Sequence, residues 1–182
     1  MVSEKGRAWH SQVRICISIE RLQMSGTDEL CDLWMSFVEA ERSFSSCSMM
    51  LFNHRAELTP LLAQALNRPK ERSAALYIVE HLGVEERMRV FDNLLILASN
   101  VHGHTERSRG ILLSLPMQWV LENIEARAEP LLHEATQEEY RALFELYLEL
   151  DQGLARRLAE RALNHLDPEV REAGEEFMEQ LT

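Results

Sequence analysis

The sequence predicts an all-α protein, and composition, periodicity and regularly spaced helix breakers support this fold class. Ala, Leu, Glu and Arg dominate the 182 residues, whereas Gly and Pro number only seven and five, and such a composition favours helices. After residue 25 the period-two alternation typical of strands is almost absent. Caps and breakers instead divide residues 28–182 into segments of helical length. We therefore expect a right-handed α-solenoid of about four helical pairs, preceded by a longer N-terminal capping helix.

Residues 1–23 differ from the rest of the chain. They are mildly basic, and from Val13 to Ile19 apolar and polar residues alternate, which predicts a short strand. Met24 would serve as a native start. We expect residues 1–23 to be an N-terminal tail or an upstream extension of the reading frame, and residues 24–182 to be the helical repeat domain.

A long amphipathic helix is expected from Asp28 to about Leu51. Asp28 can cap its first turn, and apolar residues recur at spacings of three, four and seven, as they do along one face of a helix. This stripe consists of Leu30, Trp34, Phe37, Val38 and Phe44. We expect it to be buried, with Trp34 in the core, because a helix at the start of an array can cap the first pair.

Further helices are expected at each cap or breaker that follows. Thr59-Pro60 offers an N-cap and then a Pro at the first helical position, where a backbone N–H is not needed. Thr136-Gln-Glu-Glu139 has the pattern of a capping box, and Asp167-Pro168 again combines a cap with a first-position Pro. Between these, one helix is expected from Val84 to about Ser99 and others on either side of Pro116.

Two similar segments lie 99 residues apart and indicate an internal repeat. RPKERSAALYIVEHL spans residues 68–82 and DPEVREAGEEFMEQL spans residues 167–181, and they share five identical residues without a gap. The second helix of each pair is expected to begin near residues 69, 104, 137 and 168, at intervals of 35, 33 and 31. Helical pairs of this length predict a solenoid, since each pair needs a neighbour to cover its apolar face.

The phrase DPEVREAG at residues 167–174 resembles the start of the second helix of HEAT repeats, where Asp-Pro-x-Val-Arg-x-Ala-Ala is typical, and PKERSAA at residues 69–75 is similar to it. The matching positions are Pro69, Arg72, Ala74, Asp167, Pro168, Val170, Arg171 and Ala173. The resemblance implies that Arg72 and Arg171 join a polar ladder between repeats and that the small residues let helices approach closely. It covers about residues 56–182, but residues 84–150 depart from the pattern. Tetratricopeptide and armadillo repeats are the competing assignments.

The charge balance bears on possible partners. The formal net charge is −11, and residues 122–179 hold 16 carboxylates against 6 arginines. Binding to phosphate backbones or anionic membranes needs a basic surface, so the charge balance argues against nucleic acid and against a membrane as partners. Another protein with a basic surface would suit the acidic half, although a merely solvated helix face explains the same charges.

Cysteine usage and the lack of a long apolar run favour a cytoplasmic protein. Cys16, Cys31 and Cys47 are an odd number without a CxxC pair, as expected of reduced thiols, and we expect Cys31 and Cys47 to be buried or half-buried. No signal peptide or run of about 20 apolar residues is visible. The 17 arginines against 2 lysines favour a GC-rich genome and a bacterial source.

Candidate binding residues lie on the expected second helices. They are Tyr77, His81, Arg107, Tyr140 and Tyr147. Aromatic residues on the inner wall of a solenoid would anchor a partner, and an equally good alternative is that these tyrosines close the joints between repeats. No catalytic, cofactor or metal motif stands out, since His102-Gly-His104 lacks further ligands and is expected to be an exposed turn.

Three functional hypotheses follow. HEAT-like arrays mostly bind proteins through the concave face, so the leading hypothesis is a non-catalytic interaction module, either an adaptor or an inhibitor of the immunity type. A second is a HEAT-like enzyme, because the family includes DNA glycosylases and lyases that attach bilins. The acidity of the chain opposes a glycosylase, and nothing in the sequence points to a tetrapyrrole. A third is a structural subunit of a larger assembly.

A chain that begins at Met24 should be as stable as the full chain, because residues 1–23 differ from the array in charge sign and periodicity. Thermal melting of both chains is the measurement, and the two Tm values should agree within about 5 °C. A larger drop would show that residues 1–23 pack against the core.

Overall fold

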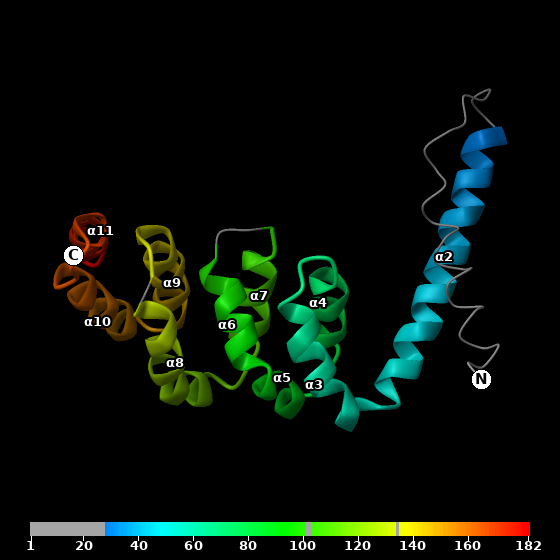
Figure 1. Cartoon of the computed structure of the whole chain (residues 1–182), viewed down its shortest axis with the longest axis horizontal. Helices are drawn as coiled ribbons and strands as arrows, with labels where there is room; N and C mark the ends of the chain where they lie inside the picture. Colours follow the sequence, from blue (N-terminus) through cyan, green and yellow to red (C-terminus); the bar gives the residue numbers. More distant parts are fainter. Residues whose placement is uncertain (1–27, 101–102, 134) are drawn as a thin grey trace, which may run out of the picture. The chain divides into compact units, whose positions relative to one another are not determined.

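The computed structural model describes residues 28–100, 103–133 and 135–182, with the exception of the side chains of Asp28 and Ala56. Within these ranges the chain forms helices and turns and no strand, so the all-α fold class is confirmed. The predicted tail and its short strand lie outside the described residues. The chain divides into two units, residues 1–47 and residues 48–182, and each is considered by itself (Figure 1).

The helices follow one another with short connections. In chain order they are α2 (Asp28–Phe52), α3 (Arg55–Leu66), α4 (Arg72–Glu80), α5 (Val84–Arg89), α6 (Phe91–Ser99), α7 (Thr105–Leu113), α8 (Met117–Leu132), α9 (Gln137–Leu150), α10 (Gln152–Leu163) and α11 (Pro168–Gln180).

Helix α2 has the predicted length, but its apolar stripe is not buried. Leu30, Trp34 and Phe37 are 66%, 61% and 63% exposed, and the Trp34 and Phe37 rings stack on each other at 5.8 Å. The prediction that Trp34 lies in the core is therefore wrong, and so is the expectation of burial for Cys31 and Cys47, which are both exposed. An amphipathic pattern shows that a helix has an apolar face, but not which surface covers that face.

Residues 48–182 contain helices that pack as sequential pairs. Helix α3 contacts α4, α6 contacts α7, α8 contacts α9, and α10 contacts α11, while α9 also contacts α10 and α6. Successive pairs also touch, through α4 with α7 and α9 with α11, and through α3 with α6 and α6 with α8. Figure 1 shows these helices side by side in chain order. We call α3, α6, α8 and α10 the first helices, and α4, α7, α9 and α11 the second helices.

Helix α3 begins earlier than predicted. Its first residue is Arg55, so Pro60 lies inside the helix instead of at its start. Leu58 and Leu62 are both 4% exposed and lie one turn apart on the buried face. Burial of Leu58 stabilises the extra turn by about 1.5–3 kcal/mol, which offsets the one backbone hydrogen bond that Pro60 cannot donate.

The expected helix from Val84 to Ser99 is broken at Val90. The backbone of Val90 has φ −105° and ψ 14°, and it separates the charged α5 from the apolar α6. Six of the nine residues of α6 are buried, whereas α5 contains no buried residue. The break keeps the charges of α5 at the surface while α6 enters the core. The hydrophobic pattern alone did not show it because neither Gly nor Pro marks the site.

The motif arginines act within their own pair. Arg72 Nε donates to the Leu66 carbonyl oxygen at 2.9 Å, and Arg171 Nη1 donates to the His165 carbonyl oxygen at 2.8 Å. In both cases the acceptor is six residues earlier: Leu66 is the last residue of α3, and His165 lies in the turn after α10, where carbonyl groups lack helical partners. The expectation that Arg72 and Arg171 join a ladder between repeats is therefore wrong. The shared arginine closes the turn between the two helices of one pair.

The other motif positions are partly confirmed. Asp167 caps α11 by accepting from the Glu169 amide, and Pro168 occupies the first helical turn. The equivalent Pro69 lies in a turn, and α4 begins only at Arg72.

The small residues at the motif differ between the two segments. Ala173 is fully buried, whereas Ala74 is exposed and Ala75 takes the buried position. At Gly174, which is equivalent to Ala75, an added Cβ would lie 2.7 Å from the Leu163 amide nitrogen. Helices α10 and α11 therefore approach each other so closely at Gly174 that only a glycine fits there.

Helix α11 covers the fourth pair with its apolar side. Val170 and Phe177 are 0% and 2% exposed, and the Phe177 ring stacks on Phe144 of α9, with centroids 4.0 Å apart and planes 5° apart. Glu172, Glu175 and Glu179 are exposed. A polar outer side is what a terminal repeat needs in water.

Phe177→Ala should lower the free energy of unfolding by about 3–5 kcal/mol, because it removes a buried ring and its stacking contact. Glu175→Ala, two residues away on the exposed side, should change the free energy by no more than about 0.5 kcal/mol. Denaturant titration of both variants is the measurement. Equal, small effects would contradict the burial of α11 against α9.

Candidate protein-binding surface

Arginine–carboxylate pairs join the second helices of successive helical pairs. Arg107 of α7 makes a bidentate pair with Glu80 of α4, with both N···O distances 2.6 Å. Arg141 of α9 pairs with Glu176 of α11 at 2.5 Å, and its guanidinium lies 5.9 Å from the Phe177 ring centroid. Each contact therefore binds one helical pair to the next.

The first helices carry an equivalent set. Arg157 of α10 makes a bidentate pair with Glu125 of α8 at 2.8 and 2.9 Å, and Arg161 pairs with Glu129 in the same way one turn later. Arg127 of α8 donates to Asp92 of α6 at 2.8 Å. The Arg127 guanidinium also lies 5.6 Å from the ring centroids of Phe91 and Trp119.

We call these contacts, together with Arg109–Glu145, the arginine ladder. Its pairs join residues that are 27, 32, 35 or 36 positions apart, which is close to the 31–35 residue interval between second helices. The sequence did contain a signal for them, because arginines and carboxylates recur about one repeat apart. It did not identify the pairs, since which arginine meets which carboxylate depends on how the helices stack.

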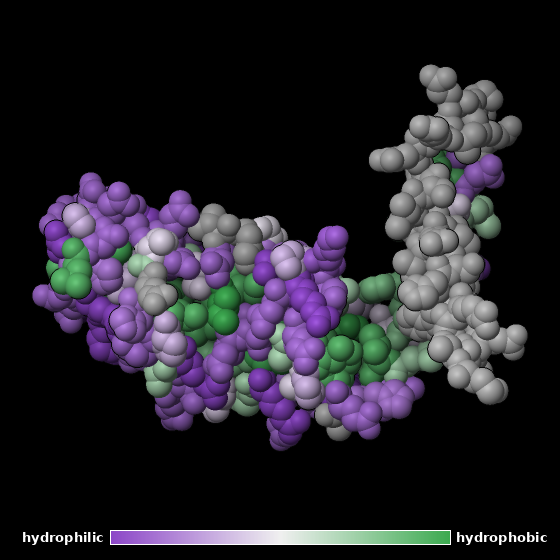
Figure 2. Space-filling view, viewed as in Figure 1, coloured by the Kyte–Doolittle hydropathy of each residue, from purple (hydrophilic) through white to green (hydrophobic). Residues whose placement is uncertain are grey.

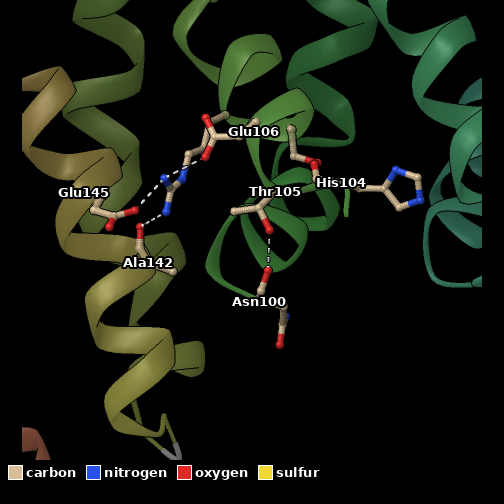
Figure 3. A network of polar contacts seen from close by, with 8 residues as sticks. Asn100, His104, Thr105, Glu106, Ala142 and Glu145 are labelled. Carbon is tan, nitrogen blue, oxygen red and sulfur yellow. Dashed lines mark hydrogen bonds and ion pairs between the residues drawn. The ribbon is translucent and has the colours of Figure 1, made fainter. Parts of the chain in front are cut away.

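Arg109 is the most buried member of the ladder. The residue is 5% exposed and links α7 to α9 through two contacts: Nη1 to the Glu145 carboxylate at 2.8 Å and Nη2 to the Ala142 carbonyl oxygen at 2.7 Å. Glu106 of its own helix accepts a third contact at 3.2 Å. Glu106 and Glu145, both labelled in Figure 3, therefore accept from the same nitrogen, Nη1. Burial strengthens such hydrogen bonds because water does not compete for them.

The energy of the exposed ladder pairs is modest. An exposed ion pair contributes about 0–1 kcal/mol, whereas burial of one Leu or Phe side chain contributes about 1.5–3 kcal/mol. Bidentate geometry nevertheless fixes direction and distance. The guanidinium groups hold the pKa of Glu80, Glu129 and Glu176 below the usual value, chiefly through side-chain hydrogen bonds. The ladder therefore sets how successive pairs align more than it sets overall stability.

Three of the predicted binding residues come together on α4 and α7. The Tyr77 and His81 rings lie 4.6 Å apart on α4, and His81 Nδ1 is 2.7 Å from the Tyr77 carbonyl oxygen. Arg107 reaches the same helix through Glu80. His81 is exposed, whereas Tyr77 and Arg107 are half-buried. These residues form an accessible polar and aromatic cluster, with Arg107 already held by Glu80.

Tyr140 and Tyr147 do not lie on a surface. They are 0% and 2% exposed, so the hypothesis that they anchor a partner is wrong, and the alternative that they fill the joints between helices holds. Tyr140 Oη accepts from Arg161 Nε at 3.3 Å. The Tyr147 hydroxyl is buried, and the described residues give it no hydrogen-bond partner. Burial raises the pKa of the Tyr147 phenol.

An acidic surface covers the exposed sides of α9 and α11. Its carboxylates are Glu138, Glu145, Glu149, Glu169, Glu172, Glu175 and Glu179, and all seven are exposed. The Arg141–Glu176 pair joins the two helices, and we call their exposed carboxylates together the acidic surface. Within the described part of the chain, Glu149, Glu172, Glu175 and Glu179 form no ion pair. Figure 2 shows that the end of the chain with α10 and α11 is largely hydrophilic in this view.

Two open clefts lie between helical pairs. One of about 430 Å³ is lined by residues from the ends of α3 and α6 and the starts of α4 and α9, among them Arg72, Asn100 and Glu138. The other, of about 340 Å³, is lined by Glu80, Arg87, Arg107, Gly110, Ile111 and Ser114. Arg87 Nη1 donates to Ser114 Oγ there at 2.7 Å. Both clefts are shallow joints next to the second helices, and neither gathers a recognisable set of catalytic groups.

In the described part of the chain, a metal site would need a cluster of ligating side chains, and a membrane span would need a long apolar helix. Its residues contain no group of three or more His, Cys, Asp or Glu side chains placed to hold a metal ion. No helix in the described ranges is both long enough and apolar enough to cross a bilayer. His102 lies outside the described residues, and the His104 carbonyl accepts from the Ser108 amide at 3.0 Å at the start of α7.

Comparison of the chain with protein-family models, with curated proteins and with solved structures gives no match. Interpretation of this surface therefore depends on its own residues and geometry.

Removal of the Tyr147 hydroxyl should stabilise the protein. Tyr147→Phe should raise the free energy of unfolding by about 1 kcal/mol, because a buried hydroxyl without a partner is destabilising. Tyr140→Phe is the matched control, and it should lower the free energy by about 0.5–1.5 kcal/mol because the hydrogen bond from Arg161 is lost. Denaturant titration measures both values. The same sign for both variants would contradict the difference between the two hydroxyl groups.

Proposed function

We propose that this chain is a non-catalytic protein-binding module whose domain, residues 24–182, is a short right-handed α-solenoid of HEAT-like pairs. Sequential pairing of α3 with α4, α6 with α7, α8 with α9 and α10 with α11 supports this architecture. The arginine ladder adds support, since its contacts repeat at about the length of one helical pair. In such an array the second helices form the concave face and bind the partner.

The acidic surface on α9 and α11 is the observation that carries the proposal. Both helices are second helices, and their exposed sides present seven carboxylates. The nearby arginines Arg109, Arg141 and Arg161 are already held by Glu145, Glu176 and Glu129. The ladder therefore neutralises these arginines with carboxylates inside the array, and the glutamates on the outer side of α11 form no ion pair within the described part of the chain.

A surface of this kind fits a protein with a basic face. Complementary charge raises the rate of association and sets orientation, and it acts over a Debye length of about 8 Å at physiological ionic strength. The exposed His81 ring and the half-buried Tyr77 ring, at the first of the second helices, would supply aromatic contacts. The module would serve as an adaptor, or as an inhibitor of the immunity type that masks a basic enzyme.

Charge reversal on α11 tests the proposal. The triple variant Glu172→Lys, Glu175→Lys, Glu179→Lys changes exposed residues only, so the fold should be retained. Wild type and variant are used to capture proteins from a lysate of the source cells, with quantification by mass spectrometry. A basic protein should be enriched by wild type and reduced at least about tenfold on the variant, and its capture should weaken as salt is raised.

A matched control separates the specific surface from net charge. Glu57→Lys, Glu85→Lys, Glu160→Lys makes the same change at exposed positions on α3, α5 and α10, and it should capture the basic protein as wild type does. Equal capture by wild type and the α11 variant, or equal loss on both variants, would contradict a partner site on α9 and α11.

A further inference from the structure

Helix α2 carries most of the exposed large hydrophobic residues of the described chain. Of the 14 large hydrophobic residues that are exposed there, nine lie on α2: Leu30, Leu33, Trp34, Met35, Phe37, Phe44, Met49, Met50 and Leu51. Soluble monomers rarely expose contiguous apolar patches of more than a few hundred Å². The helix therefore carries an apolar face that is largely accessible to solvent.

The exposed residues follow the spacing of a coiled-coil seam. Leu30, Trp34, Phe37 and Phe44, with Glu41 in the gap, succeed one another at intervals of four, three, four and three residues. With Leu33 they fall within an arc of about 100° on the helix. An alternating four–three repeat matches another helix with the same repeat, because the side chains of each can pack into the spaces of the other.

The residues that flank the seam carry no charge, so they cannot select a partner helix by its charge. On one side lie Cys31, Val38 and Ser45, and on the other Ala40 and Cys47. Heterologous helix partners are usually selected by charged residues at these flanking positions, and none is present here. The acidic residues Asp32 and Glu39 lie on the opposite side of the helix and would stay in water.

We propose that α2 binds α2 of a second copy of this chain and forms a homodimer. A second copy offers the same seam and the same uncharged flanks. Six residues on and beside the seam, Leu30, Leu33, Trp34, Phe37, Phe44 and Leu51, are between 37% and 66% exposed. At roughly 200 Å² for a fully exposed large side chain, covering these exposed fractions would bury roughly 600 Å² per chain. Two chains then bury more than the roughly 1,000 Å² that a specific interface needs.

Glu41 determines the direction of the two helices. In a parallel pair in register, the two Glu41 carboxylates would face each other at the seam, and like charges at an apolar interface are destabilising. In an antiparallel pair each Glu41 lies beside a residue such as Phe37 of the second copy and reaches water at the edge. The α2 helices are therefore antiparallel.

The test is sedimentation equilibrium of the full chain and of two variants. Phe37 lies in the seam and Met35 lies off it, yet both are 63% exposed, so Phe37→Glu and Met35→Glu are matched substitutions. Wild type should be a dimer, Phe37→Glu should raise the dimer Kd at least about 30-fold, and Met35→Glu should leave it within about threefold. Circular dichroism should show the same helix content in all three proteins.

Other outcomes overturn the proposal. If the wild type is monomeric, the seam is covered by residues before α2 or by a different protein, and the homodimer proposal is wrong. If the two substitutions have equal effects on the dimer Kd, the interface does not involve the seam. Mixing wild type with Glu41→Lys tests direction: antiparallel helices should give mixed dimers at the statistical proportion. A strong excess of mixed dimers would indicate that the wild-type Glu41 carboxylate faces the substituted lysine across a parallel seam, against the antiparallel arrangement.

Discussion

The packed part of this protein depends on the burial of apolar side chains between successive helical pairs. A single pair of helices covers only one side of each helix, so the other side needs a neighbour. Phe144 on Phe177 joins the third pair to the fourth, and Phe91 against the edge of Trp119 joins the second pair to the third. These aromatic contacts supply large buried areas, and the remaining features are arranged around them.

The arginines act on top of this apolar packing. Apolar contact tolerates small shifts between helices, whereas a bidentate contact such as Arg157 with Glu125 tolerates few. The same contacts distribute charge unevenly. Arginines inside the array are held by carboxylates of the neighbouring pair, and the carboxylates on the outer side of α11 stay free of ion pairs among the described residues. The arginine–carboxylate pairs between helical pairs thus account for both the alignment of the helices and the acidity of the proposed binding surface.

Helices α11 and α2 differ in where their apolar side chains lie. Helix α11 turns Val170 and Phe177 inward and presents glutamates to water, so it needs no further partner. Helix α2 presents Leu30, Trp34 and Phe37 outward, and burial of such residues is favourable wherever a matching surface is available. The first arrangement suits a site for a polar partner, and the second suits association with another apolar helix.

The sequence by itself determined the features that depend on local physics. Composition predicted an all-α chain, and Asp167 and Thr136 predicted caps that the structure contains. Tertiary structure decided what local pattern cannot encode. Helix α3 begins before Pro60 because Leu58 is buried, Tyr140 and Tyr147 are core residues, and the exposure of Trp34 depends on which surface packs against α2.

Arg72 and Arg171 bind nearby carbonyl groups, while Arg107 and Arg141 reach carboxylates one repeat away. The physical reason is that periodicity fixes which face of a helix is apolar, whereas contacts between residues far apart in the chain depend on how whole helices stack.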